Sequence, residues 1–470
     1  MSEILTWLEA NETILSAIAA AVVVLSIVGA AMRNAYRKTS TAFVGTARAT
    51  KEVLSNGTAP VVDVSQPVPG FGGRPAIAVL PFDNMSEDPD QDYFADGITE
   101  DILTSLQSFR TFPVIARNST FAYKGKSMDL REVAKQLGAG YILEGSVRKS
   151  GDKVRITGQL IDKDGHHIWA DRFDRDLSDI FAVQDEITST IVGAIAPEID
   201  GADIRQVHGK PTENMDAWDC VLRAQSLGNE TSAESLKEAH ALLKKAVELD
   251  PQIAQAYAML AGVVFSDFAR SDGKALGLGR TESLKKAAEY AAKALSIDRS
   301  FPAAHGILGI THAYLQNMEL GLKETREAVR LNPSDTQIRF LHAQVLAMSG
   351  NFSEALEELE LGKRLSPSDP WIGRIITFET IYLFAMGRLE EAERRVIEAI
   401  AARPQHPLPR YVQVFILDGL SRGEEAQMAY QEGSRLVPDF SPNYFFQLFA
   451  GQPKIDQQIR DALRRAGWES

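Results

Sequence analysis

Hydrophobic and polar side chains follow three different patterns along this chain of 470 residues. Residues 13–32, TILSAIAAAVVVLSIVGAAM, run for twenty positions without a charge, which is the length that a helix needs to cross a bilayer. Residues 154–160 alternate apolar with polar side chains, which is typical of a strand with one buried face. Between residues 217 and 438, small residues recur at a long, regular interval. The pattern predicts a membrane helix, an α/β part and a repetitive part, in that order.

The uncharged run at residues 13–32 is interpreted as a transmembrane helix behind a short N-terminal segment, residues 1–12. A cleaved signal peptide fits less well, because the run has no basic start and no clear A-x-A site. A buried soluble helix is the other alternative. Basic residues follow the run (Arg33, Arg37, Lys38) and only acidic ones precede it, so the positive-inside rule places the C-terminal part in the cytoplasm. We expect a single-pass protein of the inner (cytoplasmic) membrane, with a periplasmic C-terminal part as the alternative.

Residues 33–74 lack a sustained period and, from residue 39 on, are rich in Thr, Ala, Gly, Pro and Val, so we expect a flexible tether. An α/β domain then spans residues 75–197. Its apolar runs, turn residues and helix caps predict the order βαβαβββα. The expected strands are 76–82, 112–117, 141–149, 153–162 and 166–175, and the expected helices are 96–109, 129–137 and 178–196.

Six similar tripeptide endings organise the second half of the chain. They begin at Leu249, Ile297, Leu331, Leu365, Ala402 and Leu436. Three of the five steps between them measure 34 residues, the period of tetratricopeptide repeats, in which pairs of helices stack into a solenoid. Two positions in each unit, where paired helices approach closely, hold only Ala or Gly. These residues are Ala239, Ala246, Ala287, Ala294, Gly321, Ala328, Ala355, Gly362, Ala392, Ala399, Ala426 and Gly433. The sequence predicts six repeats over residues 217–438, after a linker at 198–216 and before capping helices at 439–470.

Several motifs of the α/β part resemble those of the TolB-N-terminal-like domain of bacterial membrane-linked proteins. They are IAVLPF (77–82), YFADGITE (93–100), VIAR (114–117), YILEGSVR (141–148) and IWADRFDR (168–175). The resemblance, which extends over about residues 75–470, implies that this domain directly precedes tetratricopeptide repeats. Many relatives of this architecture carry a class III adenylate cyclase domain or a winged-helix DNA-binding domain ahead of the membrane span. Only 12 residues precede the span here, so we expect neither domain in this polypeptide.

Charge and cysteine content narrow the possible partners. The formal net charge of −13 argues against nucleic acid as the main partner. Cys220 is the one cysteine in the sequence, which excludes an intrachain disulfide and a cysteine-rich zinc site. The sequence also lacks the motifs G-x-x-x-x-G-K-[ST], G-x-S-x-G, H-E-x-x-H and C-x-x-C. We expect no enzyme activity and no cofactor.

Two clusters have residue types that bind metals, and both fit a plainer explanation better. Asp88, Asp90 and Asp92 have a D-x-D-x-D spacing that suits calcium, but the loop lacks the glycine and glutamate that such sites place further along. We expect an exposed acidic loop there. His166 and His167 are adjacent on an expected strand, so their side chains point to opposite faces and cannot share one metal.

Three further features lie within the repeats. His305 and His312 fall at positions that normally carry packing side chains, whereas His342 has no evident partner in the sequence. Residues 268–280 are an insertion between the two helices of the second repeat. They form either a ligand-contacting loop or a surface insertion, which loops tolerate at little cost.

The concave surface of the expected solenoid is the best candidate for a binding site. Its register places six candidate side chains there: Ile310, Tyr314, Gln337, Phe340, Gln344 and Met348. This mixed apolar and polar surface suits a peptide or helix with apolar anchors, although the same residues could simply pack between repeats. The sequence thus predicts a non-catalytic, membrane-anchored scaffold or sensor with a protein or peptide partner. A periplasmic cell-envelope or export component and a regulatory subunit of a nucleotide-cyclase signalling system are the alternatives.

Overall fold

The computed structural model describes residues 62–86, 88, 91–109, 112–195, 214–227, 232–437, 446, 448, 449 and 451–468. All of them belong to one compact unit, Pro60–Ser470, whereas the other unit, Met1–Ala59, lies outside the described residues. The transmembrane helix expected at 13–32 and most of the expected tether and linker therefore lie outside them as well. In the described part, no helix combines the length and the apolar character that crossing a bilayer requires.

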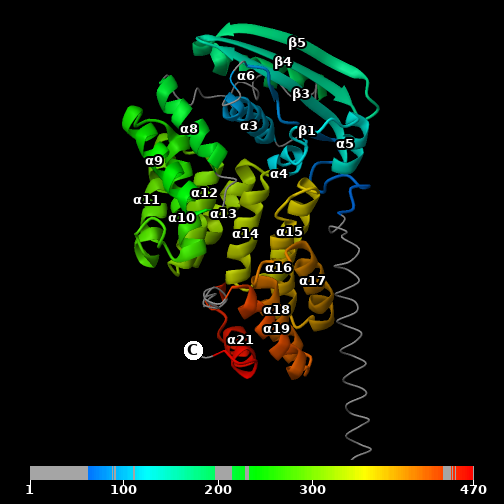
Figure 1. The fold of residues 1–470 in the computed structure, drawn as a ribbon, viewed down its shortest axis with the longest axis vertical. Coiled ribbons are helices and arrows are strands. Elements are labelled where there is room, and N and C mark those ends of the chain that lie inside the picture. The colour runs from blue at the N-terminus through cyan, green and yellow to red at the C-terminus, as the bar shows by residue number, and fades with distance from the viewer. Residues whose placement is uncertain are drawn as a thin grey trace, which may run out of the picture. The chain divides into compact units, whose positions relative to one another are not determined.

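The α/β domain is built on one mixed sheet (Figure 1). Its strands are β1 (Ala76–Val79), β2 (Asp83–Asn84), β3 (Ala139–Ser150), β4 (Lys153–Asp162) and β5 (His167–Asp176). β3 pairs in parallel with β1 and β2 and antiparallel with β4, which in turn pairs antiparallel with β5. Tight turns join β3 to β4 and β4 to β5, as the turn residues of the sequence predict.

Helices cover both faces of this sheet. α3 (Asp92–Ser108) and α6 (Ile180–Ile195) pack on one face, and α5 (Leu130–Leu137) packs on the other. Because alternate residues of a strand face opposite sides, β1 supplies Ile77 to the core under α3 and Ala78 to the core under α5.

The segment between α3 and α5 differs from its prediction. The strand expected at residues 112–117 forms only an isolated bridge to β1, through Val114. The helix α4 (Arg117–Phe121) follows it, and the sequence predicts neither α4 nor β2. The full strand is a wrong prediction because the main chain leaves the sheet at this point. The N–H of Ala116 donates to the carbonyl of Leu365 in the repeats (2.8 Å) instead of to a neighbouring strand.

The second half of the described chain is a stack of helix pairs. The pairs are α8 (Met215–Leu227) with α9 (Ala233–Leu249), α10 (Ala254–Ser271) with α11 (Arg280–Ile297), α12 (Pro302–Tyr314) with α13 (Met318–Leu331), α14 (Thr336–Met348) with α15 (Phe352–Leu365), α16 (Ile372–Ala385) with α17 (Leu389–Ala402), and α18 (Leu408–Gly419) with α19 (Gly423–Leu436). The second helix of each pair ends at the first residue of one tripeptide ending. The predicted tetratricopeptide-like solenoid is confirmed.

The small residues of the third pair lie where its two helices touch. A Cβ atom on Gly309 of α12 would stand 2.5 Å from Thr325 Cγ2 and 2.9 Å from the carbonyl oxygen of Gly321, both on α13. Ala328, one turn further along α13, is fully buried. A larger side chain at Gly309, Gly321 or Ala328 would push α12 and α13 apart, whereas a Cβ atom on Gly362 of α15 would meet no atom within 4 Å.

After the last pair, α21 (Pro453–Arg465) packs on α18 and α19. It buries Ile459 and Leu463 in the core of the repeats. This helix lies in the segment 439–470 where capping helices are expected, and most of residues 439–450 lie outside the described residues.

Candidate functional site

The turn between α15 and α16 docks on the α/β domain. Besides the bond from Ala116 to Leu365, the hydroxyl of Ser119 accepts a hydrogen bond from the N–H of Ser368 (2.8 Å). The same hydroxyl lies 3.0 Å from the hydroxyl of Ser366, and both serines are fully buried. Residues 247 to 249 positions apart are thus joined through main-chain groups and buried hydroxyls.

Asp369 completes this contact. Its carboxylate accepts hydrogen bonds from the side chain of Asn118 (3.2 Å), from the hydroxyl of Ser366 (3.1 Å) and from the N–H of Trp371 (2.8 Å). The side chain is buried, so these donors stand in for water around the charge. One carboxylate therefore ties the domain to the turn and the turn to the start of α16.

The preceding turn, between α13 and α14, docks beside it. The N–H of Val114 donates to the hydroxyl of Ser334 (3.3 Å), and the side-chain amide of Asn332 donates to that of Gln107 (3.2 Å). We call the contacts of residues 107–119 with the turns at 332–334 and 365–369 the joint. Sequence reasoning missed it, although a signal exists: of the six endings, only these two continue as Pro-Ser-Asp.

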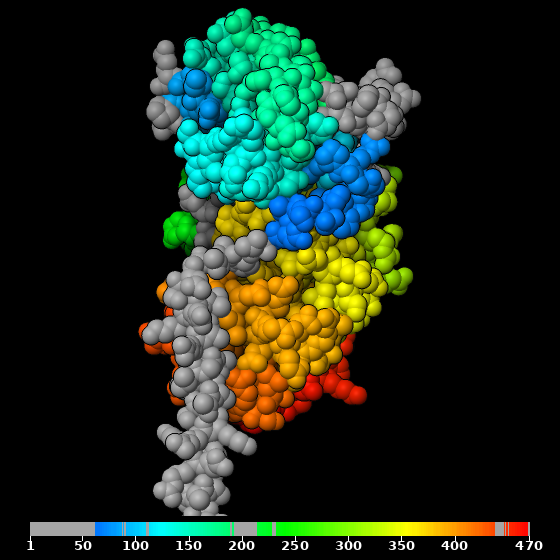
Figure 2. Space-filling model, turned by 90° about the vertical axis from the view of Figure 1, so that its right-hand side faces the viewer, coloured from blue at the N-terminus to red at the C-terminus, as the bar shows by residue number. Residues whose placement is uncertain are grey.

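The end of the expected tether also packs on the repeats. Val68 and Phe71 are buried against Leu365, with Leu361 beside them. The guanidinium of Arg364 donates to the carbonyl of Gln66. In Figure 2, this stretch is the blue surface that lies on the yellow surface of the repeats. Residues 62–74 are therefore packed, because two large apolar side chains are buried there, and are not part of a free tether.

The first repeat helix, α8, packs into the domain from another side. Trp218 of α8 lies edge-on between Phe94 (5.6 Å between ring centroids) and Phe181 (5.0 Å). The hydroxyl of Tyr93 donates to the carboxylate of Asp219 on α8 (2.6 Å). The core under α3 thus includes side chains of the first repeat.

One carboxyl group near α8 has a strongly shifted pKa. Loss of solvent raises the pKa of Asp101 to about 7, an effect that a hydrogen bond from Gln184 partly offsets. A group with this pKa can exchange a proton near neutral pH. Its hydrogen bond joins α3 to α6, so it belongs to the packing between helices.

The six candidate groove residues are mostly covered. Phe340 (7% exposed), Gln344 (5%), Met348 (4%) and Ile310 (0%) are buried, Tyr314 is half-buried and Gln337 is exposed. Phe340 packs edge-on against Phe378 (4.9 Å), and the guanidinium of Arg374 lies over its ring (4.3 Å) while donating to Gln337 (3.2 Å). Gln337 is the one candidate that the described structure leaves open to a partner.

The insertion in the second repeat covers one end of this surface. The carboxylate of Asp267 is fully buried and accepts hydrogen bonds from the N–H groups of Ala275 (3.2 Å) and Leu276 (2.8 Å). Leu276 packs on the same core as Tyr314, whose ring lies 5.1 Å from that of Phe268. The insertion is thus an ordered loop of the repeat core.

The C-terminal segment covers the other end. Phe449 is fully buried and packs beside Phe352 (6.3 Å). A Cβ atom on Gly451 would lie 3.2 Å from the carbonyl oxygen of Met348. The chain's own C-terminal part therefore occupies space next to a predicted groove residue.

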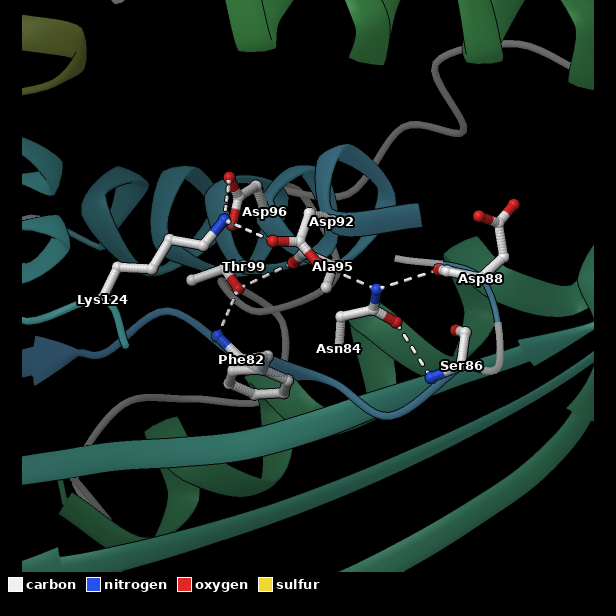
Figure 3. A network of polar contacts seen from close by, with 9 residues as sticks. All are labelled: Phe82, Asn84, Ser86, Asp88, Asp92, Ala95, Asp96, Thr99 and Lys124. Atoms are coloured by element: carbon white, nitrogen blue, oxygen red, sulfur yellow. Dashed lines mark hydrogen bonds and ion pairs between the residues drawn. The ribbon is translucent and has the colours of Figure 1, made fainter. Parts of the chain in front are cut away.

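The acidic loop before α3 is held by internal contacts (Figure 3). The side-chain amide of Asn84 donates to the carboxylate of Asp92 (2.8 Å) and to the carbonyl of Asp88 (3.2 Å). The ammonium of Lys124 contacts Asp92 (3.6 Å) and Asp96 (2.7 Å). These contacts account for the carboxylate of Asp92 without a metal, and Asp90 of the D-x-D-x-D sequence lies outside the described residues.

The turn between β4 and β5 brings Asp162, Asp164 and His166 together. The sequence predicts His166 on a strand. In the structure β5 begins at His167, so His166 lies in the turn and that part of the prediction is wrong. Asp162 accepts hydrogen bonds from the N–H groups of Asp164 and His166 (both 2.9 Å), and the His166 ring contacts its other oxygen (2.9 Å). This pattern is that of an aspartate-stabilised turn, which explains the cluster without a metal.

Two histidines of the repeats, His305 and His342, have protein partners. The ring of His305 contacts Glu324 (2.6 Å) and the carbonyl of Arg299 (2.9 Å). His342 is buried and lies 2.9 Å from the hydroxyl of Thr325. Burial lowers the pKa of His342 to about 4. Thr325 is the partner that the sequence does not reveal, because it lies on the preceding repeat.

A buried ion pair links two helices of the repeats, α15 and α16. The ammonium of Lys363 on α15 contacts Glu379 on α16 (2.6 Å) and Glu360 (2.6 Å), and Lys363 and Glu379 are both buried. Burial raises the pKa of Glu379, while Lys363 opposes this shift. The pair places opposite charges together inside the stack, which points to a structural role.

The fold and the joint define a class of protein: a mixed α/β domain fused to a tetratricopeptide-like array. A family model described as "HilA/YgeH-like transcriptional regulator, second domain" matches residues 73–190, which is the α/β domain. Its description differs from the TolB-N-terminal-like domain that the motifs resemble.

Two curated relatives match longer stretches. "Putative adenylate cyclase 3" of Rhizobium meliloti is 41% identical over 256 residues, which cover 54% of this chain and 43% of the relative. "Transcriptional regulator HilA" of Salmonella typhimurium is 24% identical over 313 residues, 66% of this chain and 54% of the relative. The chain thus spans about half the length of the curated relatives it matches.

Two solved structures are also similar. The crystal structure of YrrB, "a TPR protein with an unusual peptide-binding site", is 25% identical with a TM-score of 0.28, and covers 43% of this chain and 94% of that one. That of TolB from Acinetobacter baumannii is 17% identical with a TM-score of 0.22, and covers 28% of this chain and 30% of that one. The assignment of the repeats rests on the helix pairs and their endings described above.

Proposed function

We propose that this chain is a non-catalytic protein-interaction protein in which the α/β domain and the repeats act together. The joint carries the proposal. Two successive turns of the array are bonded to the domain through buried main-chain and side-chain groups, so a partner that touches both parts meets a preset surface. Stacked helix pairs supply long surfaces of the kind that bind proteins and peptides.

The names of the two curated relatives support this proposal. One names a cyclase and the other a transcriptional regulator, and both share sequence with this chain over part of their length. A region that is shared by proteins with different named activities is better explained as an interaction or regulatory region than as the domain that carries out either activity. A regulatory role in a nucleotide-cyclase signalling system is the second candidate, favoured by the 41% identity to the Rhizobium relative.

The partner is proposed to contact the repeats around Gln337. This side chain is exposed and is held by Arg374, beside the ring of Phe340. A peptide with polar and apolar groups suits such a surface. Because the other five candidates are buried or half-buried, Gln337 is the natural point for a test.

The chain is further proposed to be anchored in the cytoplasmic membrane by residues 13–32, with its TolB-N-terminal-like domain and repeats in the cytoplasm. The support is the uncharged run and the basic residues that follow it. A C-terminal reporter that is active only in the cytoplasm is expected. A reporter active only in the periplasm would favour a cell-envelope or export role instead.

The interaction is tested by capture with the tagged full chain from membrane extracts. We expect reproducibly enriched proteins, and Gln337→Arg should reduce at least one of them several-fold by adding a second cation beside Arg374. Lys285→Glu, an equally exposed change on α11, is the matched control and should leave capture unchanged. Absence of any enriched protein would count against the proposal. Formation of a cyclic nucleotide by the purified chain from ATP or GTP would contradict its non-catalytic part.

A further inference from the structure

β5 ends the sheet with an open edge. It is the last strand in the order β1-β3-β4-β5 and pairs only with β4 in the described part of the chain (Figure 1). The strand is ten residues long, and all but two of its side chains, Trp169 and Phe173, are exposed. An edge of this length carries a row of N–H and C=O groups that can pair with another strand.

The contacts of β5 reveal which of its main-chain groups point outward. The N–H of Leu177, just after the strand, donates back to the carbonyl of Asp152 beside β4 (2.8 Å). In the strand, the N–H of Arg172 bonds to the carboxylate of Asp171 (2.7 Å), and the carbonyl of Asp174 bonds to the guanidinium of Arg175 (3.1 Å). The N–H of Arg172 and the carbonyl of Asp174 thus bond to side chains of neighbouring residues and not to β4. Because the direction alternates along a strand, the even-numbered residues present their main-chain groups to the outer edge.

The charges of this edge are arranged symmetrically about Phe173. Asp171 and Arg172 precede it, and Asp174 and Arg175 follow it. If a second β5 lies antiparallel with Phe173 opposite Phe173, then Arg172 faces Asp174 and Asp171 faces Arg175. This register also places outward-facing residues opposite one another, as antiparallel pairing requires.

Neighbouring registers lack this match. A shift that centres the pairing on Arg172 places Arg172 against itself, and a shift that centres it on Asp174 places Asp174 against itself. Like charges directly opposite one another are destabilising in a sheet. The strand therefore favours one register of self-pairing and disfavours the two adjacent to it.

We propose that β5 pairs antiparallel with β5 of a second copy of this chain, about a twofold axis at Phe173. In this register residue 170 faces residue 176, and residue 172 faces residue 174. Each pairing occurs twice about the twofold axis, so the two copies would exchange about eight N–H···O bonds. Both copies use the same surface, as in most symmetric dimers. Inside one chain, Asp174 already contacts Arg155 of β4 (2.5 Å) and Arg172 of its own strand (3.1 Å), so pairing between copies would add to or exchange with these contacts.

Charge reversal tests the pairing in the purified full chain. We expect a dimer in sedimentation equilibrium. Arg172→Asp creates two like-charge pairs per dimer and should raise the dissociation constant about tenfold or more. The double change Arg172→Asp/Asp174→Arg restores opposite charges between the copies but leaves a like charge opposite Arg155 within each chain, so it should recover part of the dimerisation. Lys135→Glu, an exposed reversal on α5, is the control and should change nothing.

Disulfide trapping tests the register. Residues 172 and 174 of opposite copies would have Cα atoms about 5.5 Å apart, within reach of a disulfide. A mixture of Arg172→Cys and Asp174→Cys chains should therefore form the mixed disulfide far faster than either chain links to itself. Cys220 is buried and present in every variant, so the unchanged chain measures the disulfide formation that does not involve the new cysteines.

A chain that is monomeric at every concentration tested overturns the proposal, and so does a dimer that the charge reversals leave unchanged. Equal trapping within and between the two cysteine variants overturns the register.

Discussion

Asp369 offers the sharpest test of the joint. Replacing it with Ala removes an acceptor for Asn118, Ser366 and the N–H of Trp371, at distances of 3.2, 3.1 and 2.8 Å. The site is 5% exposed, so water cannot replace the lost oxygens. Each donor left without a partner costs about 1 kcal/mol, which gives a loss of about 3 kcal/mol in the free energy of unfolding.

The assay is urea unfolding of the purified full chain in mild detergent, followed by tryptophan fluorescence. Asp369→Asn keeps one acceptor oxygen and should cost only about 1 kcal/mol. Asn118→Ala completes a double-mutant cycle across the joint, and we expect a coupling energy of about 1–2 kcal/mol between Asn118 and Asp369. This coupling reports the contact itself and not the separate stability of either part.

A coupling energy near zero would refute the reasoning, because it would mean that Asn118 and Asp369 do not meet in solution. A loss for Asp369→Ala equal to that for Asp369→Asn would also contradict it, since the buried donors would then have found other partners.

The remaining predictions concern the repeats. Gly309→Ala should lower the unfolding free energy by about 1–3 kcal/mol, because its Cβ atom would stand 2.5 Å from Thr325 Cγ2. Gly262→Ala in α10 is the matched control, because no atom lies within 4 Å of the added Cβ. It should leave the unfolding free energy unchanged or raise it by up to about 1 kcal/mol. Equal losses for the two variants in urea unfolding would contradict close packing at Gly309. Burial holds the pKa of His342 at about 4, below its ordinary 6.5. The unfolded chain therefore takes up this proton first, so stability should fall as the pH drops from 6.5 towards 4, by about 2 kcal/mol at pH 5. His342→Leu should narrow the difference between the urea midpoints at pH 7 and pH 5, and an unchanged difference would show that His342 titrates normally.

The repeats follow from the sequence because their pattern is local. A pair of helices must meet at Gly309 and Gly321, and each unit must end where its second helix ends, so the same residue types return every 34 residues. The hairpins around β4 are equally local, since turn residues and alternation of side chains define them.

The joint does not follow from any local pattern. The residues around Ala116 predict a strand, in which its N–H would bond to a neighbouring strand. In the structure this N–H donates to the carbonyl of Leu365, about 250 residues away in the sequence. The exposure of the expected groove residues does not follow from a local pattern either. They lie on α12 and α14, the first helices of their pairs, but register cannot tell that the insertion at Leu276 and the C-terminal Phe449 pack nearby.

The protection of one amide tests the central claim, that the domain and the repeats form one unit. The N–H of Ala116 should exchange with deuterium as slowly as that of Leu80, which donates to Leu143 inside the sheet (2.8 Å). Asp369→Ala should speed exchange at Ala116 and leave Leu80 unchanged. If Ala116 exchanges as fast as an exposed amide while Leu80 stays protected, the domain and the repeats are not joined in solution and the account is contradicted.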